Sequence, residues 1–123
     1  MTHYDFEEKN IKMNELELIL YCFEEMLLKR EYKCETCINM CKLKKHQRNI
    51  DKYAWRCCIP VCRDYEKYFS IRKNSFFVNF RVKIRYILRV LFKYSAKHNE
   101  YTIKNSLNLD DSTVEEILKK IKN

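Results

Sequence analysis

The chain has 123 residues, which is enough for one ordinary domain or two small ones and excludes a large enzyme. Hydrophobic residues make up 46% of the chain and aromatic residues 14%, which is more buriable surface than a disordered tail carries. The formal net charge is +8, and residues 32–97 supply the excess with 17 basic and 4 acidic side chains. Such a segment attracts polyanions, of which nucleic acid is the commonest in cells, or it is only a solvated surface.

The N-terminus contains acidic side chains and no apolar run, which predicts that there is no secretory signal. No stretch reaches the roughly 18 to 20 apolar residues that span a bilayer. We therefore expect an intracellular protein, which is nuclear if the host is a eukaryote. Seven cysteines in a reducing compartment indicate metal ligation rather than disulfides.

The first predicted element is an amphipathic helix over residues 14–30, within an N-terminal segment bounded at 1–31. Asn14 is the expected cap, and we expect Cys22 to pack as a small apolar side chain rather than to bind metal. The apolar positions recur at three- and four-residue spacing. They are Leu16, Ile19, Leu20, Phe23, Met26 and Leu27.

Residues 32–78 form the second predicted element, a small zinc ribbon of short strands and turns. Two runs that favour β-structure, at 52–55 and 67–71, are the expected strands. The cysteines fall into two close pairs that 19 residues separate, the spacing of a four-thiolate zinc site. One structural zinc ion is expected, because its ligation can contribute on the order of 10 kcal/mol to a segment too small for a core. The expected ligands are Cys34, Cys37, Cys57 and Cys62.

The third ligand is open, because Cys58 closes the second pair as well as Cys57 does, and Cys41 is another alternative. His46 lies between the pairs and is expected to be a solvated loop residue, although it can substitute as a ligand. A catalytic zinc keeps one position open for water and commonly has a carboxylate base nearby. Four thiolates surrounded by lysine and arginine predict a structural site, so we expect no enzyme.

Residues 79–123 are predicted to be helical, and the clearest helix covers 79–97. Its apolar stripe comprises Phe80, Ile84, Ile87, Leu88 and Leu91. Its basic residues follow one another at four-residue steps and are Arg81, Arg85, Arg89, Lys93 and Lys97. Like charges at this spacing repel by a few tenths of a kcal/mol per pair, and a bound anion would relieve the repulsion. A solvated basic face is an equally compatible interpretation.

The last stretch has the layout of a helix-turn-helix. Ile103 and Leu107 supply the apolar positions of a short helix, and Asn108 is expected in a left-handed turn. Asp110 or Asp111 is the expected cap of the second helix. Acidic residues crowd the start of that helix and would face phosphates in a groove, so packing or partner binding is the alternative role.

The run from Trp55 to Ser95 resembles a segment of Merlin-type DNA transposases and their bacterial ISXO-like relatives, and the resemblance extends over residues 34–120. In those proteins a W-R-C-x4-C zinc half is followed by S-I-R-x-x-S-F-F and a long helix. The matching residues are Trp55, Arg56, Cys57, Cys62, Arg63, Ser70, Ile71, Arg72, Ser75, Phe76 and Phe77. The first cysteine turn departs from the family pattern, because it lacks the usual proline and following glycine.

The resemblance implies the N-terminal zinc-binding and DNA-recognition region of a transposase, truncated or domesticated. In that family the catalytic acidic triad lies in a following RNase H-like domain, and we expect that domain to be absent because the chain ends at Asn123. The overall prediction is an α+β, non-catalytic module that binds DNA mainly through phosphates. The expected DNA-binding residues are Arg56, Arg63, Arg72, Lys73, Arg81, Arg85 and Arg89.

The alternative function is a zinc-stabilised protein-interaction module, in which the acidic terminal helices bind a partner protein or a second copy of the chain. A nonfunctional transposon remnant that still folds is a further possibility. Removal of the acidic residues 1–31 is expected to separate the first two functions, since it would abolish partner binding but not DNA binding.

Overall fold

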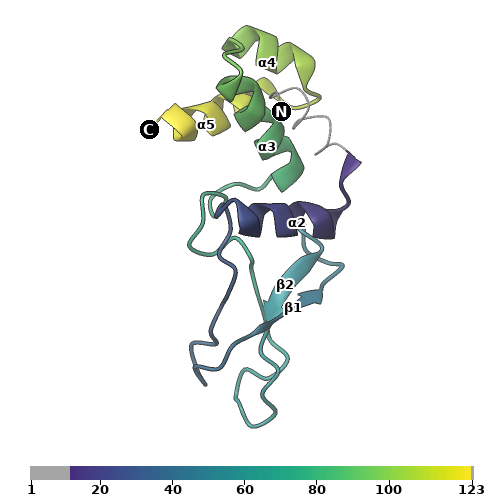
Figure 1. The fold of residues 1–123 in the computed structure, drawn as a ribbon, viewed down its shortest axis with the longest axis vertical. Helices are drawn as coiled ribbons and strands as arrows, with labels where there is room; N and C mark the ends of the chain where they lie inside the picture. The colour runs from purple at the N-terminus through teal and green to yellow at the C-terminus, as the bar shows by residue number, and fades with distance from the viewer. Residues whose placement is uncertain (1–11, 123) are drawn as a thin grey trace. The chain divides into compact units, whose positions relative to one another are not determined.

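The computed structural model describes residues 12–122, and over these the chain is α+β, with four helices and one three-stranded antiparallel sheet (Figure 1). It divides into two compact units. Among the described residues, the sheet unit comprises 14–81, and the helical unit comprises 12–13 together with 82–122. The part of the predicted N-terminal segment that precedes Lys12 lies outside the described residues. None of the helices over residues 12–122 is long and apolar enough to cross a membrane.

Helix α2 of the sheet unit spans Glu15–Glu24 and begins at the predicted cap. The Asn14 side chain accepts a hydrogen bond from the Glu17 amide at 2.8 Å, and the Glu17 carboxylate accepts one from the Asn14 amide at 3.1 Å. This capping box satisfies two amides that the start of a helix leaves without partners. The prediction of Asn14 as the cap is confirmed.

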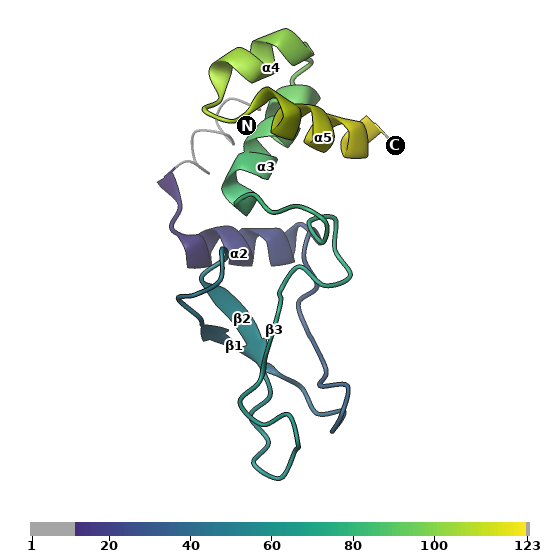
Figure 2. The ribbon, with the colours of Figure 1, turned by 180° about the vertical axis from the view of Figure 1, so that it is seen from behind.

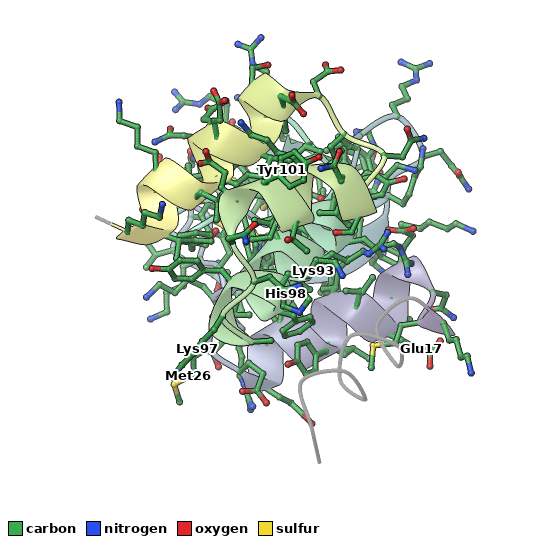
Figure 3. All side chains as sticks on the ribbon, turned by 90° about the horizontal axis from the view of Figure 1, so that it is seen from above. Glu17, Met26, Lys93, Lys97, His98 and Tyr101 are labelled. Atoms are coloured by element: carbon green, nitrogen blue, oxygen red, sulfur yellow. The ribbon has the colours of Figure 1, made fainter. Side chains whose placement is uncertain are left out.

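The end of α2 and its buried face differ from the prediction. The helix ends at Glu24 rather than at residue 30, because Met26 adopts a left-handed conformation with φ of 59°. Met26 projects from the end of α2 and is 88% exposed (Figure 3). Leu20 is also exposed, and Leu16 and Leu27 are half-buried, so only Ile19 and Phe23 of the predicted apolar stripe belong to the buried core. The residues that α2 buries are Leu18, Ile19, Cys22 and Phe23.

The sheet consists of β1 (Lys42–Lys45), β2 (Tyr53–Arg56) and β3 (Tyr68–Phe69), in the order β1-β2-β3 (Figure 2). The two predicted β-favouring runs supply β2 and β3. Strand β1 was not predicted, because its sequence KLKK has one apolar residue among three lysines. Its pairing with β2 comes from the hairpin and not from its own propensity.

Trp55 of β2 connects the sheet to α2. Its indole is buried and stacks on the Phe23 ring of α2, with 5.9 Å between the ring centroids. Neighbouring residues of a strand point to opposite faces, so Arg56 lies on the face away from α2. That second face carries Tyr68 as well, because Tyr68 pairs with Arg56 in the register of β2 and β3.

The helical unit contains α3 (Ile84–Ser95), α4 (Glu100–Ser106) and α5 (Asp111–Lys122), and each helix contacts the other two. All of the buried hydrophobic side chains in its core are aliphatic. The buried residues are Ile84, Ile87, Leu88, Val90, Ile103, Leu107, Val114, Ile117 and Leu118. Apolar burial therefore accounts for the packing of these helices.

The start of α3 and the turn before α5 correct two predictions. The predicted helix over 79–97 begins only at Ile84, because the Phe80 carbonyl is bound by Arg72 in a turn of the sheet unit. Asn108 was expected to be left-handed, but the positive φ angles of the described residues fall elsewhere. Leu107 instead makes the turn in an extended conformation, with φ of −119° and ψ of 143°.

Candidate metal centre

Cys34 and Cys37 lie in a tight turn of the sheet unit. The Cys34 carbonyl accepts a hydrogen bond from the Ile38 amide at 2.8 Å, and the Cys34 amide donates to the Asn39 carbonyl at 2.9 Å. Ile38 has a φ of 62°, a conformation that suits glycine and strains a β-branched residue by roughly 1–3 kcal/mol. Such strain persists where the surrounding structure fixes the backbone, and here it brings both cysteine side chains to the same side of the turn.

Cys57 and Cys62 lie in a second, longer turn between β2 and β3. The Cys62 amide donates to the Ile59 carbonyl at 3.0 Å, and the Glu66 amide donates to the Cys57 carbonyl at 2.8 Å. The Asp64 amide donates to the Cys62 sulfur at 3.3 Å. An amide aimed at a sulfur favours its thiolate form, which is the form that binds metal.

The two turns bring the four cysteine sulfurs together. Cys34 Sγ lies 3.8 Å from Cys62 Sγ, Cys37 Sγ lies 3.7 Å from Cys57 Sγ, and all four sulfurs lie within 4.8 Å of one another. With metal–sulfur bonds of about 2.3 Å, the sulfurs of a tetrahedral site are separated by about 3.8 Å. Cys37 is half-buried and the other three are buried. The four cysteines can therefore hold a metal ion.

The thiols of Cys37 and Cys62 differ in their pKa values. The backbone amide of Asn39 lowers the pKa of Cys37 to about 7, whereas burial raises the pKa of Cys62 to about 12. Four thiolates this close repel one another strongly without a cation. A bound metal ion would remove that repulsion and deprotonate the remaining thiols, so proton release accompanies binding.

The other candidate ligands lie outside this group of four. The Cys58 sulfur donates to the Arg56 carbonyl at 3.5 Å, which distinguishes it from the clustered Cys57. Cys41 is buried, and burial raises the pKa of its thiol to about 11. The His46 ring stacks on Tyr68 with 4.0 Å between the centroids and is not part of the cluster.

Cys22 behaves as a packed side chain. It is fully buried in α2, and this burial raises the pKa of its thiol to about 12. It is not among the clustered cysteines. The expectation that it would pack rather than bind metal agrees with this placement.

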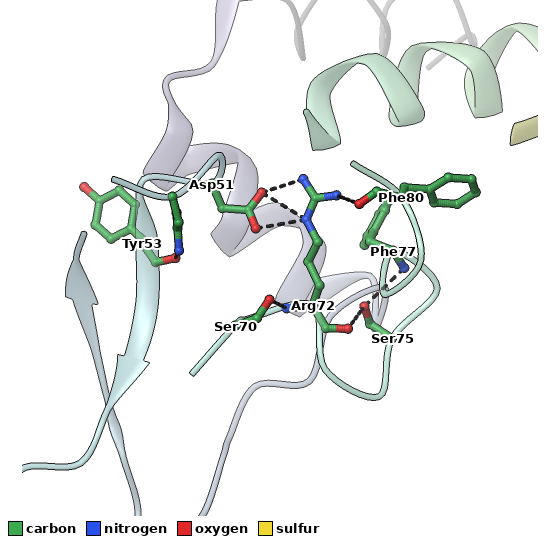
Figure 4. Close-up of polar contacts among 8 residues, drawn as sticks. Asp51, Tyr53, Ser70, Arg72, Ser75, Phe77 and Phe80 are labelled. Carbon is green, nitrogen blue, oxygen red and sulfur yellow. Dashed lines mark hydrogen bonds and ion pairs between the residues drawn. The ribbon is translucent and has the colours of Figure 1, made fainter. Parts of the chain in front are cut away.

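Arg72 lies inside the sheet unit and not at its surface. It is 5% exposed, and its guanidinium donates to both carboxylate oxygens of Asp51, which is 6% exposed, at 2.7 to 3.2 Å (Figure 4). A further bond of 2.9 Å runs from Arg72 to the Phe80 carbonyl. The predicted role of Arg72 in phosphate binding is therefore wrong, because all of this geometry directs the cation inward. Its partner Asp51 was missed, although it is one of only 4 acidic residues in 32–97.

The S-I-R-x-x-S-F-F segment around Arg72 has a structural explanation. The Ser70 hydroxyl accepts from the Arg72 amide at 3.1 Å, and the Ser75 hydroxyl donates to the Arg72 carbonyl at 2.6 Å (Figure 4). Ile71 and Phe77 are buried. The residues that carry the transposase resemblance thus shape a turn and its core.

The other predicted DNA-binding residues are distributed over both units. In the sheet unit, Arg63, Lys73 and Arg81 are exposed, although Lys73 also pairs with Glu35 at 3.6 Å. Arg56 is half-buried and pairs with Glu66 at 3.0 Å. In the helical unit, Arg85 and Arg89 lie on α3 and are half-buried, and Arg85 donates to the Met13 carbonyl. Only part of the predicted set is thus presented to solvent.

A scan against models of protein families, a search of curated proteins and a search of solved structures each found no match.

Proposed function

We propose that the protein is a non-catalytic, zinc-stabilised DNA-binding module, related to the N-terminal region of Merlin-type transposases. The observation that carries the proposal is the cluster of four cysteine sulfurs. Tetrahedral sulfur ligands suit zinc, and four protein ligands leave no position for a substrate or a water nucleophile. The ion would be structural, which is consistent with a module that binds rather than catalyses.

The surroundings of the cysteines support a structural role for the metal. Two large apolar side chains of these turns are exposed, Ile38 at 64% and Val61 at 94%, and Ile59 is only half-buried. Apolar burial therefore stabilises these turns very little. The Thr36 hydroxyl donates to the Asp64 carboxylate and links the turns, but one exposed hydrogen bond contributes only about 1 kcal/mol. A metal ion supplies the missing stabilisation.

The charge of the surface supports DNA as the partner. Residues 32–97 carry 17 basic and 4 acidic side chains. One of the four acidic residues, Asp51, forms a buried ion pair with Arg72. Arg63 and Arg81 remain exposed on the sheet unit. We assign phosphate contacts to these two residues first, and to Arg85 and Arg89 of α3 second.

The salt dependence of DNA binding tests this assignment. Arg81→Gln should reduce the slope of log K against log salt by about 0.9, the value for one lost phosphate contact on duplex DNA. Lys119→Gln removes an equally exposed charge from α5 and serves as the control. Fluorescence anisotropy with a labelled duplex measures both. Equal slopes for Arg81→Gln, Lys119→Gln and the unmodified protein would contradict the assignment.

A protein-interaction module is the second candidate, and exposed Ile38 and Val61 favour it because apolar side chains at turn tips can insert into a partner. Deletion of residues 1–31 does not test it, because Phe23 of α2 stacks on Trp55 and the deletion would damage the fold. Ile38→Ser combined with Val61→Ser is the better test. Loss of partner binding with DNA affinity unchanged would establish this second function.

A further inference from the structure

The sheet unit contains a second site, a pocket of about 540 Å³ formed by the β1–β2 hairpin loop, β3 and residues 78–81. We call it the hairpin pocket. Its volume falls within the range of about 300–1,000 Å³ that is typical of small-ligand sites. None of its lining residues is a member of the cysteine cluster. The pocket therefore has no part in metal binding.

Aromatic and aliphatic side chains line most of this pocket. The rings of His46 and Tyr68 stack with an interplanar angle of 20° and form one wall. Ile50 and Val78 add apolar surface at the mouth, where both are exposed. A flat wall with apolar neighbours suits a planar heterocycle better than a flexible chain, because stacking needs two planar partners.

The floor of the pocket is rigid. Asp51, Arg72 and Phe80 contribute to the lining, and they are the residues joined by the buried hydrogen bonds (Figure 4). Because each of these bonds involves an ionised group in a buried position, the geometry of the floor is fixed before any ligand arrives. The floor of the pocket is therefore preorganised.

One polar atom of the pocket lacks a protein partner. Asn49 Oδ1 is buried, and no group among residues 12–122 donates a hydrogen bond to it. Its orientation is fixed, because Asn49 Nδ2 donates to the Tyr53 carbonyl at 3.0 Å. Buried acceptors in proteins are nearly always satisfied, so this atom would gain a partner from a ligand N–H once the side chains that cover it move slightly. Nucleobases are planar heterocycles that carry such N–H groups.

A cation beside the pocket could contact the phosphate of a nucleotide. Arg81 lines the pocket and is exposed, and the Arg56 guanidinium lies 5.6 Å from the centre of the Tyr68 ring. A nucleotide whose base entered the pocket could thus place its phosphate on Arg81. In a duplex the base is stacked and paired, so only an unpaired base can enter.

From this combination we infer that the hairpin pocket binds one unpaired base of single-stranded DNA, with Asn49 accepting an N–H of the base and Arg81 contacting its phosphate. The inference rests on the proposed DNA-binding function and deepens it. Single-stranded DNA, rather than duplex, is then the preferred ligand of the sheet unit.

The test compares three fluorescein-labelled DNA probes on the full chain: a single strand of about 12 nucleotides, the same strand with abasic sites throughout, and the same sequence as a duplex. The abasic strand keeps the phosphates and removes every base. We expect the ordinary single strand to bind about tenfold more tightly than either of the other probes. Equal affinity for the ordinary and abasic strands would overturn the inference while leaving the proposed function intact. No salt-dependent binding of any probe would overturn the proposed function itself.

A pair of matched variants locates the effect. Val78→Trp fills the mouth of the pocket without changing charge, and Val61→Trp makes the same change at an exposed site outside it. Val78→Trp should weaken single-strand binding about tenfold and leave abasic binding unchanged, whereas Val61→Trp should change neither. Equal effects of the two variants would contradict the pocket assignment.

A measurement on the unmodified protein covers the case in which Val78→Trp does not fold. Titration with deoxyadenosine 5′-monophosphate should shift the NMR signals of the Asn49 side-chain amide and the His46 ring. Shifts confined to arginine signals would show phosphate binding alone and overturn the inference.

Discussion

The two ends of the sheet unit reach a fixed geometry by different chemistry. At one end, four cysteine sulfurs lie together between two turns in which Ile38 and Val61 are exposed. At the other end, the protein supplies both partners, because Arg72 and Asp51 neutralise each other in a buried hydrogen-bonded pair. We propose that the cysteine end depends on a metal ion from outside the chain, whereas the arginine end does not. Removing the metal should therefore destabilise the cysteine end and leave the arginine end intact.

The largest predicted effect follows from removing a cysteine ligand. Cys34→Ser should abolish tight metal binding and with it much of the stabilisation of both cysteine turns, which is on the order of 10 kcal/mol for a structural zinc. Metal content and amide hydrogen exchange of residues 34–41 and 57–66 measure the effect. Cys58→Ser is the control, because Cys58 lies outside the cluster and should leave both quantities unchanged. Retention of the metal by Cys34→Ser would contradict the assignment of the ligands.

The second effect is specific to the arginine end. Asp51→Ala leaves the Arg72 cation buried without its counter-ion, and it should lower the free energy of unfolding by about 4 kcal/mol. Glu35→Ala removes the exposed partner of Lys73 and should change stability by less than about 1 kcal/mol. Urea denaturation measures both. A similar loss for the two variants would show that the buried pair has no special role.

The helical unit provides a reference, because its core is aliphatic and it contains none of the clustered cysteines. Ile117→Ala of α5 removes a fully buried side chain and should cost about 3 kcal/mol of stability. Tyr101→Ala of α4 is the control, because Tyr101 is 77% exposed (Figure 3). Metal content should be unchanged in both variants. Loss of metal in Ile117→Ala would show that the sheet unit depends on the helical unit for its stability.

The smallest predicted effect concerns the capping box of α2. Asn14→Ala removes the acceptor for the Glu17 amide and should cost about 1 kcal/mol, whereas Asn14→Ser keeps an acceptor and should cost much less. Thermal unfolding followed by circular dichroism distinguishes the two. Identical melting curves for both variants would indicate that the cap is satisfied by water.

Features that depend on local sequence were predictable. The spacing of the cysteines predicted the cluster but left one of its members open, with Cys58 and Cys41 as alternatives to Cys57, and the structure places Cys57 in the cluster. Asn14 followed from its place before an apolar-periodic segment. Short aromatic runs located β2 and β3, since β-propensity acts over neighbouring residues. The aliphatic pattern of 103–121 likewise placed α4 and α5, although Asn108 did not adopt the expected conformation.

Features that depend on tertiary contacts were not predictable. Arg72 was expected at the surface, because sequence similarity marks a residue without saying whether it is buried, and Asp51 lies 21 positions away. The chain contains no glycine, so left-handed positions gave no signal, and they fall at residues as different as Ile38, Lys52 and Glu66. The hairpin pocket arises from three separate segments and has no sequence motif at all.

We propose that one zinc ion bound by four sulfurs stabilises the two cysteine turns. Metal analysis and X-ray absorption spectroscopy of the natively purified protein test it most directly. We predict one zinc per chain with four sulfur neighbours at about 2.3 Å, and loss of hydrogen-exchange protection at the cysteine turns after chelation. A metal-free protein whose cysteine turns remain protected would contradict the account, as would a zinc ion with nitrogen or oxygen neighbours.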